Sequence, residues 1–194
     1  MSIRECVRCE AQTLKGVRCK KRTCMYSKFC NVHTKKLFNL YVKKSHIEGA
    51  GTGLYTSKMI PTNTRISQYT GELKRFDPDN ISTCDFGIPG GRVIDASSTQ
   101  AGIARYANDC RAENKRKKEC KGSNTKFSES TRNGQTTVWL VSTKRIQAGS
   151  ELFVSYGRAY WRTTVPRRTP SEPPSSTQMR TLLNDVGLTG RPVL

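Results

Sequence analysis

One segment decides the fold, and it reads Glu151-Leu152-Phe153-Val154-Ser155-Tyr156-Gly157. Residues 152–155 are rich in aromatic and β-branched side chains, which favours a short strand. Comparable runs predict further strands at residues 37–42, 64–69, 92–94 and 136–142. Helical periodicity is scarce, and we predict one short helix over residues 99–108 and a loop over 49–53. The sequence therefore predicts a mainly β fold with short helices.

Composition excludes two classes of protein. The chain of 194 residues carries 34 Lys and Arg against 15 Asp and Glu, a formal charge of +19. Its longest apolar runs, such as residues 138–141, are far shorter than the roughly 20 residues of a membrane span. The first ten residues contain charges and cysteines and lack the apolar stretch of a secretory signal. We therefore expect neither a membrane protein nor a secreted one.

The positive charge is concentrated near the N-terminus. Residues 1–44 hold twelve basic and two acidic side chains. Such density predicts attraction to polyanions, and nucleic acid is the first candidate. Solubility, or association with an acidic protein, would explain the same charge.

Five of the eight cysteines lie between Cys6 and Cys30, and a histidine follows at position 33. Without an export signal we expect a reducing compartment, where metal binding is favoured over disulfides. Zinc takes four N or S ligands at tetrahedral corners. The segment resembles small zinc modules with a C-x9-C-x10-C-x2-H pattern, found in some viral and phage proteins. That resemblance implies a structural zinc bound by Cys9, Cys19, Cys30 and His33.

Spacing alone leaves two alternatives open at this site. Cys6 or Cys24 could replace one of the four ligands. The cysteines could also be reduced and metal-free within a basic arm. A segment this short and polar needs a metal to fold, however, because it has few residues with which to build a core.

Four segments in order resemble the SET domain of protein lysine methyltransferases. They are Gly51-Thr52-Gly53, Tyr69-Thr70-Gly71-Glu72, the run Ala104-Arg105-Tyr106-Ala107-Asn108-Asp109-Cys110, and residues 151–157. The continuation Arg158-Ala159-Tyr160-Trp161 also resembles the compact SET enzymes of large DNA viruses. The resemblance implies a zinc-binding module at residues 1–36, a SET β-fold at 38–161, and a Pro- and Ser-rich tail at 162–194.

The resemblance also implies roles for individual residues. Tyr156 matches the catalytic tyrosine. The cofactor S-adenosylmethionine would be bound by Gly51, Thr52, Gly53, Arg105, Asn108, Asp109, Tyr156 and Trp161. The substrate channel would be lined by Tyr106, Val154 and Tyr160. Such a channel must be narrow and apolar, because the nucleophile is a neutral amine while a free lysine has a pKa near ~10.4.

Two residues depart from the family pattern. Asp109 stands where the family usually has histidine, and Val154 stands where many members have Phe or Tyr. The function implied is methyl transfer from S-adenosylmethionine to a lysine of a histone or histone-like basic protein, in the nucleus or a virion. The basic N-terminal segment would contact DNA or the nucleosome, and a homodimer stays open. The alternative is a zinc-dependent protein that binds nucleic acid or chromatin and has an inactive SET-like domain.

Overall fold

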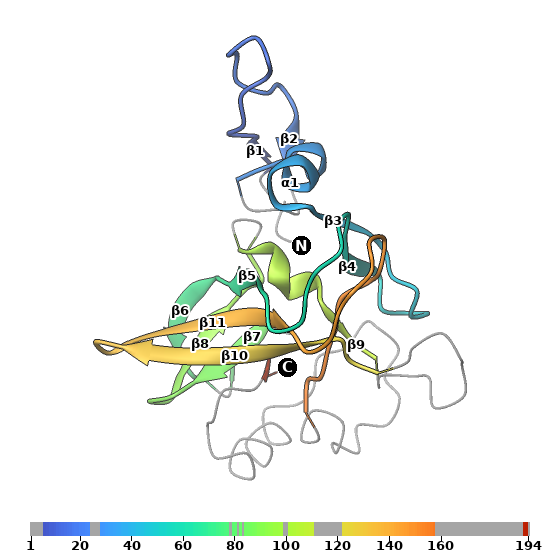
Figure 1. Ribbon diagram of the computed structural model, residues 1–194. Coiled ribbons are helices and arrows are strands. Elements are labelled where there is room, and N and C mark those ends of the chain that lie inside the picture. Colours follow the sequence, from blue (N-terminus) through green and yellow to red (C-terminus); the bar gives the residue numbers. More distant parts are fainter. Residues whose placement is uncertain are drawn as a thin grey trace.

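The computed structural model describes residues 6–23, 28–77, 79–80, 82, 84–98, 101–110, 122–157 and 192–193. A small N-terminal region stands on a larger body built of strands (Figure 1). The N-terminal region contains β1 (Val7–Arg8), β2 (Arg22–Thr23) and α1 (Asn31–Phe38). The body contains β3 (Leu40–Lys44), β4 (Thr52–Thr56), β5 (Arg65–Tyr69), β6 (Glu72–Arg75), β7 (Asp85–Ile88), β8 (Arg92–Asp95), the 3-10 helix η1 (Ile103–Tyr106), β9 (Asn108–Asp109), β10 (Thr125–Arg132), β11 (Gln135–Ser142), β12 (Phe153–Val154) and β13 (Pro192–Val193). The predicted mainly β fold with short helices is confirmed.

The N-terminal region is built from a hairpin followed by the helix. β1 and β2 pair antiparallel, and a bridge joins Gln12 to Arg18. The chain turns between them, where Gly16 adopts φ +72°, a conformation that favours glycine. Leu14, at the tip of this turn, is 96% exposed. This region therefore has little apolar material of its own to bury.

The strand predicted at residues 37–42 is wrong at its start. Helix α1 continues through Phe38 and ends at Asn39, which adopts the left-handed conformation with φ 58°. Asparagine tolerates that conformation and commonly ends helices. The apolar run is thus divided, and its second half forms β3, which pairs antiparallel with β4. The predicted loop at 49–53 likewise gives way to β4 from Thr52 onward.

Several small sheets form the body. β10, β11 and β5 form one sheet, and β13, β7, β8 and β6 form another. The strands predicted at 64–69, 92–94, 136–142 and 152–155 correspond to β5, β8, β11 and β12. The helix predicted over 99–108 is too long at its end: among its described residues, Ile103–Tyr106 form a 3-10 helix, whereas Asn108 belongs to β9, which pairs in parallel with β12. Residues 99 and 100 lie outside the described part of the chain.

The two larger sheets share one hydrophobic core. Tyr69, Phe86 and Phe127 meet there with ring centroids 5.1 to 5.4 Å apart. Leu54, Val138 and Leu140 are fully buried in the same cluster. Burial of this apolar surface is the main force that holds the body together.

Helix α1 connects the two regions. The Asn31 side chain accepts a hydrogen bond from the backbone N–H of Val42 at 3.3 Å, and the backbone N–H of Ser57 donates to the carbonyl of Asn39 at 2.7 Å. A cavity of about 310 Å³ lies beside the helix, between Phe38 and Trp139 among other residues. Within the described residues, the structure contains no helix long and apolar enough to cross a membrane.

Candidate functional site

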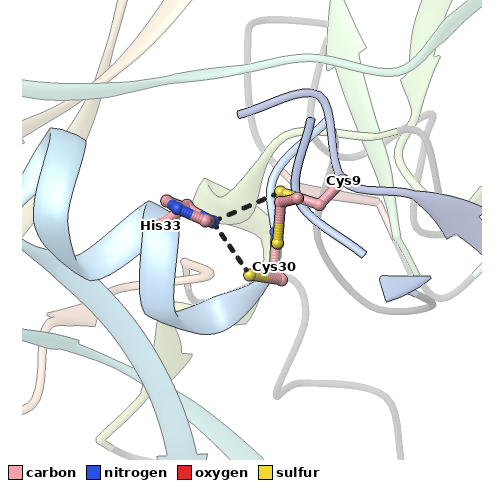
Figure 2. A group of neighbouring side chains, drawn as sticks. Cys9, Cys30 and His33 are labelled. Atoms are coloured by element: carbon pink, nitrogen blue, oxygen red, sulfur yellow. Dashed lines mark hydrogen bonds between the residues drawn. The ribbon is translucent and has the colours of Figure 1, made fainter. Parts of the chain in front are cut away.

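The structure brings together the four zinc ligands predicted from the sequence. One ligand atom each from Cys9, Cys19, Cys30 and His33 lies within 4.8 Å of the others. The Nδ1 atom of His33 is 3.5 Å from the sulfur of Cys9 and 3.3 Å from that of Cys30, and the imidazole points at both sulfurs (Figure 2). A tetrahedral zinc with ordinary bond lengths separates a nitrogen and a sulfur ligand by about 3.6 Å. The spacing therefore fits zinc.

Local structure explains how these residues meet. Cys30 is the residue at which α1 begins, and His33 lies one turn later on the same side of the helix. The hairpin supplies Cys9 and Cys19, held in register because the N–H of Cys9 donates to the Lys21 carbonyl and that of Cys19 to the Ala11 carbonyl. All three cysteines are buried, at 0 to 5% exposure.

Backbone N–H groups around the sulfurs suit thiolates. The N–H of Cys30 donates to the sulfur of Cys9 at 3.3 Å, and the N–H of Lys21 donates to that of Cys19 at 3.4 Å. Although burial opposes the charged form, hydrogen bonds from the Cys30 and Ala11 backbones lower the pKa of Cys9. Burial raises the pKa of Cys30, which a bound cation would reverse.

Other cysteines are separated from this set. Cys6 and Cys110 are each disulfide-bonded, so the expectation of fully reduced cysteines is wrong at these positions. Cys9, Cys19 and Cys30 are free thiols. The cluster thus excludes Cys6 as a ligand, whereas Cys24 lies outside the described residues.

The parallel pair β9–β12 brings the two motif segments together. Phe153 lies opposite Asn108, and Val154 lies opposite Asp109. The buried Asp109 carboxylate accepts a hydrogen bond from the backbone N–H of Tyr156 at 2.7 Å. Aspartate at the position where histidine was expected therefore fixes the backbone of Tyr156.

The Tyr156 phenol has a defined place as well. Its hydroxyl donates to the backbone carbonyl of Ala107 at 3.1 Å. The side chain packs against the main hydrophobic core and remains half-buried. The phenol therefore has an apolar body against the core and a polar atom with a hydrogen-bond partner.

Asn108 links this centre to the predicted cofactor loop. Its amide Nδ2 donates to the carbonyl of Thr52 at 3.1 Å. Gly51 adopts φ +66°, and a Cβ there would face open space. At Gly53 a Cβ would lie 2.1 Å from a carboxylate oxygen of Glu151, so only glycine fits. The loop thus presents exposed backbone beside Asn108, which fits a cofactor bound mainly through main-chain contacts.

Sequence reasoning missed Glu151, which is the hub of the site. The residue is 2% exposed, and its carboxylate accepts hydrogen bonds from the Ser45 hydroxyl at 2.6 Å, the His46 backbone N–H at 2.9 Å and the Tyr55 hydroxyl at 2.8 Å. It also lies 3.4 Å from the amide of Asn108. A glutamate inside an otherwise apolar strand was the available signal, because a buried carboxylate must have partners.

Residues around Glu151 interact with its carboxylate and hold the backbone that leads into β12. Burial, together with the hydrogen bond to the Glu151 carboxylate, raises the pKa of Tyr55 far above its ordinary value. The Asn124 side chain donates to the Glu151 carbonyl at 2.8 Å and accepts from the N–H of Phe153 at 2.8 Å. Buried polar groups thereby fix the strand that precedes Tyr156.

The remaining predicted site residues lie at the margin of this centre. The Arg105 guanidinium donates to the carbonyls of Ala96 and Ser98 and to the Tyr106 hydroxyl, which indicates that it braces the loop after β8. Val154 is 1% exposed within the core. The roles of these three residues in cofactor or substrate binding stay predictions, and Tyr160 and Trp161 lie outside the described residues.

The family model described as the SET domain matches residues 51–157, more than half of the chain. The chain belongs to the SET-domain family. The match contains the Gly51–Gly53 loop, Asn108 and Tyr156, and it excludes the Cys/His cluster, which is a separate N-terminal feature. No curated protein matches the chain.

Solved structures similar to this SET-domain chain have low sequence identity. One is ctPRC2 in an autoinhibited conformation bound to S-adenosylmethionine, with 23% identity over 62% of this chain and 15% of that one, and a TM-score of 0.49. Another is KRYPTONITE in complex with mCHG DNA and SAH, with 22% identity over 62% and 24%, and a TM-score of 0.49. The chain therefore spans less than a quarter of the length of these relatives.

Proposed function

We propose that the protein is an S-adenosylmethionine-dependent protein lysine N-methyltransferase. Membership of the SET-domain family supports this class of activity. The observation that carries the proposal is the β9–β12 pair, which joins Tyr156 to Asp109 and sets Asn108 against the Thr52 carbonyl. The residues to which we assign catalysis and cofactor binding are distant in sequence, and their proximity supports the proposal.

The chemistry requires positioning more than covalent work from the protein. When bound, S-adenosylmethionine supplies an electrophilic methyl group on a sulfonium sulfur. A neutral lysine nitrogen held in line with that methyl group would accept it as the carbon–sulfur bond broke with its electron pair left on sulfur, and the methylated nitrogen would then lose a proton to solvent. In our proposal Tyr156 orients the neutral amine, and Val154 and Tyr106 line the apolar approach that keeps water from it.

We further propose a histone or histone-like basic protein as substrate, in the nucleus or a virion, with DNA contacted by the zinc module. Of the basic side chains there, Arg8, Arg18 and Arg22 donate to backbone carbonyls of the hairpin and so hold its structure. Lys15, Lys20 and Lys21 are exposed. These lysines are the groups that we expect to contact phosphates, in a salt-dependent manner.

Cofactor titration and methyl transfer test the enzymatic proposal. Wild-type protein should bind S-adenosylmethionine in calorimetry and transfer labelled methyl to histones. Tyr156→Phe should keep cofactor affinity within about twofold and lose at least roughly 100-fold in kcat, because it removes only the hydroxyl that orients the amine. Tyr41→Phe, outside the centre, is the matched control. Full activity in Tyr156→Phe would show that the catalytic residue is wrongly assigned.

The alternative function is nucleic-acid binding by a protein whose SET domain is inactive. The exposed lysines of the module favour it, because they would serve binding without any chemistry. Absence of cofactor binding, combined with salt-dependent binding to duplex DNA that Lys20→Glu weakens, would establish this alternative in place of the enzyme.

A further inference from the structure

The C-terminal end of the chain lies on an edge of the sheet next to the catalytic centre. β13 pairs antiparallel with β7, with Pro192 opposite Phe86 and Val193 opposite Asp85. Figure 1 shows this strand, in red, beside β7 although it is the last described part of the sequence. Without β13, β7 would be an edge strand, with an unpaired row of N–H and C=O groups open to another extended chain.

The covered edge begins close to Tyr156. The hydroxyl of Tyr69 donates at 2.6 Å to the carbonyl of Cys84, the residue immediately before β7. Tyr69, Phe86 and Tyr156 all pack in the main core. After burial and Cys84, the Tyr156 phenol contributes to the raised pKa of Tyr69, as expected for neighbouring phenols. A chain paired with Asp85 and Phe86 therefore lies along a strand that borders the same core as Tyr156.

Charge shows what kind of chain this edge would accept. Residues 71–98 reverse the sign of the whole protein, with five acidic side chains (Glu72, Asp77, Asp79, Asp85 and Asp95) against three basic ones (Lys74, Arg75 and Arg92). Asp85, at the register position of Val193, is 4% exposed, and within the described part of the chain its Oδ1 atom has no hydrogen-bond partner. This edge fits an extended basic peptide.

The tail, residues 158–194, has the positive charge of a basic peptide substrate but lacks the lysine of one. Residues 158–194 contain six arginines and no lysine, although the whole chain has 34 Lys and Arg. The tail therefore offers positive charge without a lysine amine that could accept a methyl group. Its charge resembles that of a basic peptide substrate, but it cannot itself be methylated on lysine.

We propose that β13 is a pseudosubstrate strand that competes with the peptide substrate for the edge of β7. This inference rests on the proposed methyltransferase function. Of the described residues of the tail, two pair with β7, and Pro192 has no N–H to donate, so we expect the strand to be held weakly enough to be displaced. Because it is attached to the enzyme, its occupancy does not depend on protein concentration, and apparent substrate affinity falls by the fraction of time that the edge is covered.

Deletion and substitution of β13 in the full-length zinc-loaded protein test the inference. Deletion of residues 191–194 should lower the KM for a basic histone peptide about fivefold, the scale of one or two backbone hydrogen bonds, with kcat and cofactor affinity unchanged. Val193→Pro, which removes the donor that β13 retains, should have the same effect. Val193→Ile keeps that donor and is the matched control, with an unchanged KM. Equal KM values in all four proteins would overturn the proposal.

Two further measurements separate this inference from the proposed function. A synthetic peptide of residues 185–194 should inhibit the deletion variant competitively against the histone peptide and not against cofactor. Hydrogen exchange needs no activity: the amides of Asp85–Ile88 should lose protection on deletion and regain it when the basic peptide is added. Unchanged protection in β7 overturns the inference. Absence of cofactor binding and methyl transfer in every variant, with the exchange result as expected, overturns only the proposed function.

Discussion

Different interactions stabilise the N-terminal module and the SET domain. In the module, buried side chains gather around Cys9, Cys19 and Cys30, while Leu14 and Val17 remain exposed. The SET domain has a continuous core of large apolar residues, and beneath its candidate site lie the buried carboxylates Glu151 and Asp109. From this difference we expect the module to need a metal to fold, and we expect the polar network of the domain to shape a site that its apolar core already supports.

Metal removal should produce the largest difference in stability between the N-terminal module and the SET domain. Apo protein, or Cys19→Ser, should lose protected amides throughout residues 6–36 while the SET core stays folded, because the binding free energy of structural zinc, about 10 kcal/mol or more, is also the folding free energy of its module. Metal analysis should give one zinc per wild-type chain. The control Cys84→Ser alters a cysteine outside the cluster and should keep the metal. A folded module in metal-free protein would contradict the comparison.

Substitution of Glu151 should have the opposite effect: it should destabilise the SET domain and leave the N-terminal module intact. Glu151→Ala leaves the Ser45 hydroxyl and the His46 N–H without their acceptor and removes one of the two acceptors of the Tyr55 hydroxyl, at a cost of about 3–5 kcal/mol to the SET domain. Denaturant unfolding monitored by Trp139 fluorescence measures that loss, and zinc content should remain unchanged. Glu129→Gln, on the exposed part of β10, should change stability by less than about 0.5 kcal/mol. Loss of zinc in Glu151→Ala would mean that the two regions unfold together.

The same contrast explains which parts could be predicted from sequence. The residues of the Cys/His cluster and Tyr156 stand in local sequence patterns, so resemblance to known families could single them out. Glu151 was missed because its partners at positions 45, 46 and 55 are about a hundred residues away. β10 was missed because most of its residues are polar and exposed, and it is a strand because β11 pairs along its whole length. β13 has no local signal at all, since only the edge of β7 makes it a strand.

Variants of Asp109 should show that this aspartate positions Tyr156, although the family usually has histidine at its place. Asp109→Ala removes the acceptor for the Tyr156 N–H and should cost about 1–3 kcal/mol of stability and lower methyl transfer, because Tyr156 loses its backbone anchor. Asp109→Asn retains an acceptor oxygen and should recover most of both losses. Thermal unfolding and kcat measured together check the pair. Equal activity of the alanine variant and wild type would mean that Asp109 does not position Tyr156.

The smallest expected effect is a change in the stability of the SET domain with pH that comes from Asp85. Burial first, and then the nearby charge of Asp95, raise the pKa of Asp85 to about 6 from an ordinary value of 3.8. The folded protein thus binds this proton more tightly than the unfolded chain, so the Asp85 contribution to stability is fully present below pH 3.8 and is lost as pH rises through 6. Asp95 has the opposite pH dependence. Although burial opposes its charged form, hydrogen bonds from Lys74 and Ser97 lower its pKa to about 2, so its contribution to stability is lost only below pH 3.8.

Asp85→Asn should therefore raise stability at pH 8 by about 1 kcal/mol and leave it nearly unchanged at pH 4.5. Denaturant unfolding at the two pH values measures the difference, and an equal effect at both would show that Asp85 is charged throughout, with Lys74 neutralising the pair.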